Sequence, residues 1–325
     1  MTRSITELTS RIPSWVKKII PILVSVFILY YYFHDQDWRE LVNAATGSHL
    51  TLAVLAIVIP QLVFWYFDVL IVERHIVWFY GSFCFKTYFW VRGSIYLLTM
   101  IHPILGSGGV LVYLWRRIRI PWTKLWGLML FRYGLTLWGM ILLLIPITVA
   151  MHQYGLSERV RLNMWLWWGL LLFGFIWLVE AWLCWHHKKC FGLSRILARN
   201  PESEFWTAFH TATKKQWLLT WVMGIPPIIL YLIGIYFLCL AFKINIPFLE
   251  YMVVAPLTLA IADIPIAFAG FGTTTIAFFT FFTDYGSPEA IAALTLFLPF
   301  VRAVFRAVVG LACLRPALKD INASF

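Results

Sequence analysis

The chain has 325 residues, of which 61% are hydrophobic and 13% are charged, and its formal net charge at pH 7 is +11. Soluble globular domains are less apolar, and several apolar runs are long enough to cross a bilayer, so the composition excludes a soluble enzyme and indicates an all-α polytopic membrane protein. The basic residues flank the apolar runs, which assigns them to membrane topology and anionic lipid headgroups and excludes nucleic acid as the partner.

Six full transmembrane helices are predicted along the chain. A polar cytoplasmic segment, residues 1–18, precedes the first span at about 19–33, and the acidic stretch 34–42 after it predicts a short amphipathic surface helix. The other spans are predicted at about 50–72, 126–151, 163–185, 217–242 and 290–313, and a cytoplasmic tail, 314–325, follows them.

The segment between the second and third spans does not fit a further crossing. Residues 83–101 are apolar but carry two cations, and residues 102–109 then contain a proline and three glycines, which disfavour a continuous helix. Residues 110–115 are too few to cross ~30 Å of hydrocarbon. We therefore predict a re-entrant hairpin that turns at 102–109, with its loop backbone at Pro103, Gly106, Gly108 and Gly109.

A second broken stretch lies between the fifth and sixth spans. Residues 248–262 are predicted to descend into the membrane, 263–272 to break the helix at Pro265, Gly270 and Gly272, and 273–282 to return. Broken backbone at membrane depth is tolerated where protein buries it or water wets it, and transporters build binding sites from such segments.

The distribution of charge predicts the topology. With the N-terminus inside, the predicted cytoplasmic segments hold 19 of the 26 Lys and Arg residues and the predicted external segments hold four, which favours an N-in and C-in chain. The two hairpins then enter from opposite sides, so a single transmembrane domain, 19–313, contains an inverted repeat of about 50–151 and 217–313. The alternative is that both breaks are kinks in ordinary long helices.

Charges inside the predicted spans mark a candidate site, because they are costly in a membrane. Arg302 and Arg306 lie four residues apart on one helix face and favour an anion such as a phosphate or a carboxylate. Asp263 is either a substrate contact or the structural partner of these arginines, and both alternatives stay open. The predicted substrate-binding residues are Arg302, Arg306, Arg132, Arg92, Asp263, Thr273, Thr274 and His102.

Other charged residues have simpler explanations. Asp68 and Glu73 lie near the end of the second span and are predicted to pair with nearby Arg or Lys. The basic cluster Arg116, Arg117 and Arg119 after the first hairpin is explained either by topology alone or by contact with anionic headgroups.

No catalytic or metal-binding pattern is present in the sequence. The five cysteines (Cys84, Cys184, Cys190, Cys239 and Cys313) form no CxxC, and there is no P-loop, dinucleotide-binding fingerprint, GxSxG or HExxH. We therefore expect no enzyme activity, no metal and no cofactor.

Two stretches resemble a known family. An arginine-bearing helix leading to Pro103-Ile-Leu-Gly-Ser-Gly-Gly, and a short helix ending in basic residues, resemble the first half of the membrane region of lysylphosphatidylglycerol synthase/flippase proteins. Ile264-Pro-Ile-Ala-Phe-Ala-Gly-Phe-Gly, an Asp-Tyr-Gly turn and a final helix with Arg302 resemble the second half. The resemblance covers about residues 15–315, and the sequence departs from the family's charged positions at Val110, Thr274 and Thr275.

The resemblance implies a stand-alone flippase-like protein without the synthase domain. Such a protein moves a lipid with a phosphate-bearing or aminoacylated headgroup between leaflets, here in a plasma membrane of the bacterial inner-membrane type. The favoured hypothesis is a lipid transporter whose cavity lies between the two re-entrant loops. The alternatives are a non-transporting subunit or scaffold of a membrane complex and, with less support, a membrane-embedded transferase. A homo-oligomer and a complex partner both remain open.

Overall fold

The computed structural model describes residues 46–81, 83–101, 103–135, 203–262 and 271–323, together with residues 30, 39, 43, 168–169, 172–176, 179–180, 183 and 192. Several sequence predictions fall outside these residues. They concern the first span, the surface helix at 34–42, most of the third and fourth spans, and the predicted site residues His102, Asp263, Pro265 and Gly270.

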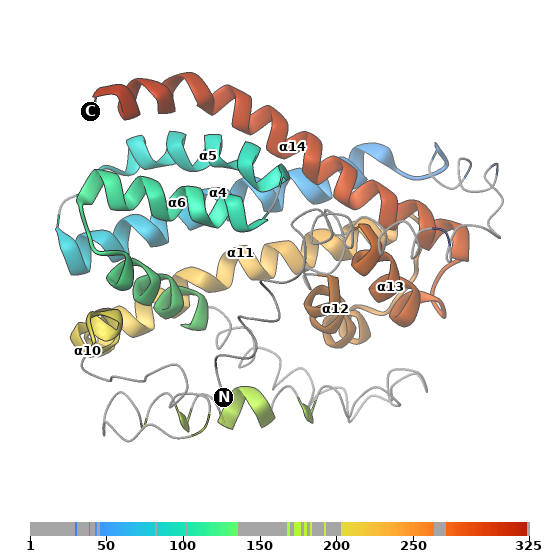
Figure 1. Ribbon diagram of the computed structural model, residues 1–325. Coiled ribbons are helices and arrows are strands. Elements are labelled where there is room, and N and C mark those ends of the chain that lie inside the picture. Colours follow the sequence, from blue (N-terminus) through green and yellow to red (C-terminus); the bar gives the residue numbers. More distant parts are fainter. Residues whose placement is uncertain are drawn as a thin grey trace, which may run out of the picture. The chain divides into compact units, whose positions relative to one another are not determined.

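Every element of the described part of the chain is helical, which confirms the all-α class (Figure 1). The first helices are α4 (Leu50–Tyr80), α5 (Phe85–Ile101), α6 (Pro103–Ile118) and a helix over residues 122–135. They are followed by η1 (Glu204–Trp206), α10 (Thr207–Thr211), α11 (Lys214–Ala241), α12 (Phe248–Ala262), α13 (Phe271–Phe282) and α14 (Pro288–Ala323).

Three of the described helices are long and apolar enough to cross a membrane. They are Leu50–Tyr80, Lys214–Ala241 and the Pro288–Lys319 part of α14, and they contain the predicted second, fifth and sixth spans. The chain is therefore an integral membrane protein by length and composition. The count of six spans and the side on which each terminus lies stay predictions from the sequence.

The chain divides into two compact units. One comprises residues 1–54 and 236–301, and the other comprises residues 55–235 and 302–325. Each unit contains one helical hairpin, since α12 packs against α13 in the first unit and α5 packs against α6 in the second (Figure 1). The two limbs of each predicted hairpin therefore pack against each other, whereas their re-entrant course in a membrane stays a prediction from the sequence.

The break in the first hairpin is shorter than predicted. Helix α5 ends at Ile101 and α6 begins at Pro103, so residues 103–109 are helical and their assignment to a loop is wrong. The reason is that Pro103 occupies the first helical position, where a missing N–H costs nothing. Glycine at position 106 serves helix packing, because a Cβ there would lie 3.0 Å from the Cβ and 3.2 Å from the Cα of Thr99 on α5.

The second hairpin shows the same difference at its return limb. Helix α12 ends at Ala262 and α13 begins at Phe271, so Gly272 lies in a helix and its assignment to the break is wrong. The three threonines that follow it, 273–275, are buried in α13. Within this unit Tyr251 of α12 is fully buried and lies 6.4 Å from the ring of Phe282, which ties the two limbs together.

In the second unit, α5 packs closely against α4 and α14 at two glycines. A Cβ at Gly93 would lie 2.8 Å from Trp65 of α4 and closer still to Cys313 of α14. A Cβ at Gly310 of α14 would lie 2.6 Å from Leu97 of α5. Small residues let helix backbones approach in a membrane, where van der Waals packing and hydrogen bonds replace the hydrophobic effect.

Two glycines of α6 allow the effect of close helix packing on stability to be distinguished from the effect of intrinsic helix propensity. A Cβ at Gly108 would meet no atom within 4 Å, whereas one at Gly106 would press on Thr99. We expect Gly108→Ala to stabilise the protein by up to about 1 kcal/mol, since alanine is the better helix former. Gly106→Ala should destabilise it by about 1–2 kcal/mol, because overpacking outweighs that gain. Thermal unfolding in detergent measures both, and equal shifts for the two variants would contradict the close packing.

Candidate functional site

A buried carboxylate joins three helices of the second unit. Asp68 of α4 is 3% exposed and accepts hydrogen bonds from Arg92 Nε of α5 and from Arg132 Nη2 of the helix over residues 122–135. Both contacts are also ion pairs, so one carboxylate holds two guanidinium groups. The predicted pairing of Asp68 with nearby arginines is confirmed.

Aromatic rings complete the surroundings of the two arginines. The Arg92 guanidinium carbon lies 5.2 Å from the ring centroid of Tyr96, and that of Arg132 lies 5.0 Å from the ring of Tyr133. A guanidinium over an aromatic face is attracted by the ring quadrupole, more strongly where water is excluded. The triad of Asp68, Arg92 and Arg132 nevertheless keeps a net positive charge, because two cations share one anion.

Three buried polar atoms near the triad are potential hydrogen-bonding groups for a ligand. Trp65 Nε1, Tyr88 Oη and Tyr96 Oη are buried and make no hydrogen bond to any residue that the structure describes. The Tyr88 side chain is fully buried and interacts electrostatically with Asp68 and with both arginines of the triad. Buried tyrosine and tryptophan usually find a hydrogen-bond partner, so these groups are candidates to contact a ligand or water.

A second pair of arginines lies on α14. The guanidinium carbon of Arg302 is 5.0 Å from the ring centroid of Tyr231 on α11, and Arg302 Nε is buried without a hydrogen bond to a described residue. Arg306 follows one turn later and interacts electrostatically with Arg302 and with Tyr96. Phe305 packs against Tyr96 at 6.4 Å between ring centroids, so α14 brings this pair beside α5.

The four arginines define an arginine cluster in the second unit: Arg92, Arg132, Arg302 and Arg306. Asp68 forms an ion pair and a hydrogen bond with each of two members, Arg92 and Arg132. Guanidinium groups bind phosphate and carboxylate with two parallel hydrogen bonds, and a buried excess of positive charge favours such an anion. The cluster therefore has the chemistry of an anion site.

The predicted site residues are only partly brought together. The four arginines lie in one unit, whereas Thr273 and Thr274 lie in α13 of the other. Asp263 and His102 lie outside the described residues. Among the residues that the structure describes, no group of three or more His, Cys, Asp or Glu side chains could hold a metal ion.

Sequence reasoning missed the aromatic part of the cluster. Tyr88, Arg92 and Tyr96 are spaced by four residues and so share one face of α5. That spacing was a usable signal, because a cation between two tyrosines on one helix face is an unusual choice for a surface that only contacts lipid. The contact of Tyr231 with Arg302 had no such signal, because the two residues lie on different helices.

The triad makes a strong prediction about stability. Asp68→Asn leaves two buried guanidinium groups without their anion, which should lower the free energy of unfolding by about 3–5 kcal/mol. Glu73→Gln on the same helix is the control, because Glu73 pairs at 3.5 Å with Arg74, whose side chain is 53% exposed. The Glu73 side chain is 13% exposed, but its partner is open to water, so the loss should stay near the roughly 1 kcal/mol of a solvent-screened pair. Unfolding by titration with a denaturing detergent measures both, and comparable losses would contradict the structural role of Asp68.

Comparison with known proteins identifies the family. A search of curated proteins and a search of solved structures each found no match to the chain. The model of the family described as lysylphosphatidylglycerol synthase TM region matches residues 18–310, which is most of the chain. The match includes both hairpins and all four members of the arginine cluster. The chain therefore belongs to the lysylphosphatidylglycerol synthase transmembrane-region family, a family of membrane proteins with a lipid-related function.

Proposed function

We propose that this protein moves a phospholipid or another lipid with an anionic headgroup between the two leaflets of its membrane. The observation that carries the proposal is the arginine cluster, in which Asp68 is the carboxylate paired with Arg92 and Arg132 while Arg302 Nε is buried without a hydrogen bond to a described residue. Membership of a lipid-related family supports a lipid headgroup as the anion that this cluster would bind.

The physical argument concerns the cost of moving a charged headgroup through hydrocarbon. A charge at the bilayer centre is expensive, so unaided transfer of a phosphate is slow. Guanidinium groups at fixed positions can replace the water that the phosphate leaves behind, with two hydrogen bonds from each arginine. The buried hydroxyls of Tyr88 and Tyr96 add neutral hydrogen-bonding groups beside these cations.

Arg302 is the member of the cluster best suited to meet the headgroup first. Arg92 and Arg132 already bind Asp68, so an incoming phosphate must compete with that carboxylate for them. Arg302 is held over the Tyr231 ring, which fixes the plane of its guanidinium without using its hydrogen-bond donors. A path between the two hairpins, an inverted repeat and a location in the bacterial inner membrane remain sequence predictions that belong to this proposal. The proposal includes no chemical step.

Transport by purified protein in liposomes tests this function. We expect Arg302→Ala to slow transbilayer movement of fluorescent phosphatidylglycerol about 10-fold to 100-fold, since a hydrogen bond to a charged group contributes roughly 1.5–3 kcal/mol. Arg302→Lys should be intermediate, because it keeps the charge and loses the planar two-point contact. The matched control is Arg315→Ala, which removes an exposed arginine from the same helix. The measurement is the rate at which an external reductant gains access to lipid from the inner leaflet.

The outcomes separate the proposal from its alternative. Rates equal to those of empty liposomes for every headgroup would overturn transport. In that case a stoichiometric complex that keeps its function with Arg302→Ala and Arg306→Ala would favour a subunit or scaffold. Equal transport rates for Arg302→Ala and Arg315→Ala would contradict a role of the arginine cluster in lipid transport.

A further inference from the structure

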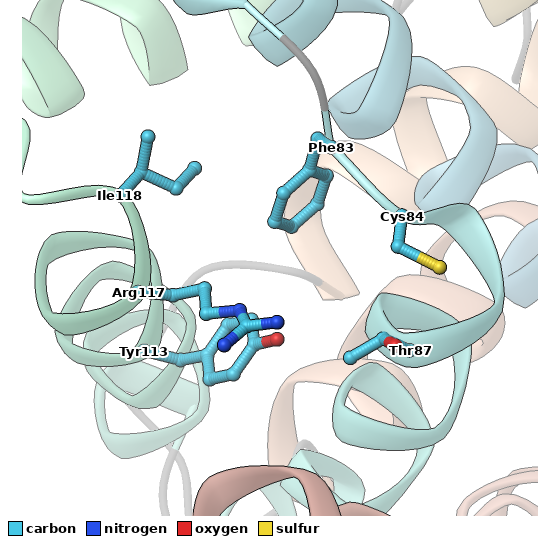
Figure 2. Close-up of a pocket in the computed structure, with 6 residues that line it drawn as sticks. All are labelled: Phe83, Cys84, Thr87, Tyr113, Arg117 and Ile118. Atoms are coloured by element: carbon cyan, nitrogen blue, oxygen red, sulfur yellow. The ribbon is translucent and has the colours of Figure 1, made fainter. Parts of the chain in front are cut away.

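A pocket lies at the open end of the α5/α6 hairpin. Its volume is ≈ 390 Å³, and it is lined by Phe83, Cys84, Thr87, Tyr113, Arg117 and Ile118 (Figure 2). The first three residues precede or begin α5, and the last three end α6. No member of the arginine cluster lines it. The volume falls within the range of small-molecule sites, near its lower end.

The lining combines a cation and two hydroxyls with apolar walls. Figure 2 shows Arg117 and Tyr113 projecting from α6 toward the space that Thr87 and Cys84 border from the other limb. Phe83 and Ile118 form the apolar part, and none of the six lining residues is acidic. An arginine with nearby hydroxyl donors suits a phosphate oxygen, and the apolar side chains suit the carbon skeleton attached to it.

The surrounding charge also favours an anion. Lys86, Arg116 and Arg119 lie within the same two helix ends as the pocket. A cluster of basic residues at a membrane surface attracts anionic headgroups, at about 1 kcal/mol per Lys or Arg.

Exposed tryptophans place this end of the hairpin at the lipid–water interface. Trp115 and Trp122 are 41% and 37% exposed, and their ring centroids lie 5.5 Å apart, directly before and after the residues that close α6. Tryptophan gathers at the headgroup level of membranes because one edge of its ring is polar and the rest is apolar. These tryptophans favour a position of the pocket beside the lipid headgroup layer, where a phosphodiester is the abundant anion.

We propose that this pocket binds the phosphate of an anionic phospholipid at the membrane surface. Arg117 pairs with the phosphate, Thr87 and Tyr113 hydrogen-bond to the headgroup, and Phe83 and Ile118 contact the glycerol and the first acyl carbons. As a binding site the pocket stands independently of transport. Its role as the position from which lipid is loaded rests on the proposed function.

Cys84 provides a reporter for the test. Its thiol is exposed and lines the pocket, whereas Cys239 and Cys313 are buried. In a background with Cys184→Ser and Cys190→Ser, the rate of maleimide labelling of the folded protein in mild detergent reports access to Cys84. A Cys84→Ser variant gives the residual rate. The probes are short-chain phosphatidylglycerol, short-chain phosphatidylcholine, glycerol 3-phosphate and inorganic phosphate.

We expect phosphatidylglycerol to slow labelling at concentrations where phosphatidylcholine and the two soluble phosphates do not. Arg117→Gln should raise the phosphatidylglycerol concentration needed about tenfold, because a charge-assisted hydrogen bond is lost. Arg315→Gln is the control, since Arg315 is an exposed arginine of α14 that does not line the pocket. Thermal unfolding checks that both variants are folded.

Each contrary outcome has a definite meaning. Equal protection by phosphatidylglycerol and phosphatidylcholine overturns the preference for an anionic lipid, and protection that survives Arg117→Gln overturns the phosphate assignment. Protection by inorganic phosphate at the same concentration overturns the lipid assignment. Lipid transport without protection of Cys84 would overturn lipid binding in the pocket and leave the proposed function intact. Protection of Cys84 without lipid transport would support binding in the pocket and overturn the proposed function.

Discussion

The second unit depends on the Asp68 carboxylate, which holds Arg92 and Arg132 at once. In a membrane the hydrophobic effect does not pull helices together, so specific polar contacts and close packing set their positions. Three ionised groups are stable there only as a bonded set, because each alone has a large desolvation cost. The carboxylate thereby fixes α5, and with it the hairpin, against α4 and the helix over residues 122–135.

The same interaction sets the charge available to a ligand. Asp68 carries one negative charge against the two positive charges of Arg92 and Arg132, and Arg302 Nε is buried without a hydrogen bond to a described residue. Tyr96 links the two pairs of arginines, since Arg92 lies over its ring and Phe305 packs against its side. Tyr96 therefore adds an aromatic contact between α5 and α14 to the close packing at Gly93 and Gly310.

The length of the apolar runs in the sequence predicted the candidate spans at α4, α11 and α14. The cost of a charge inside a membrane identified Arg92, Arg132 and Arg302 as candidate site residues, and the structure pairs the first two with Asp68. The extent of the break was misjudged because glycine serves both loops and close helix contacts. Gly106 is a helix contact, and only the position of Thr99 on the opposite limb reveals it. The two partners of Asp68 lie 24 and 64 residues away in sequence, a pairing that no local pattern specifies.

Under the proposed function, a carboxylate inside the arginine cluster has a kinetic consequence. A site with four unneutralised guanidinium groups would bind a phosphate so tightly that its release would limit the rate, and conduction through any polar site requires binding that is favourable yet reversible. Asp68 is tethered beside Arg92 and Arg132 at a high effective concentration, so it competes with the phosphate for both and hastens its departure. At the surface pocket none of the six lining residues is acidic, and water and salt screen Arg117 over about 10 Å. Solvent at the surface pocket and Asp68 in the arginine cluster would thus each limit how tightly a guanidinium group holds a phosphate.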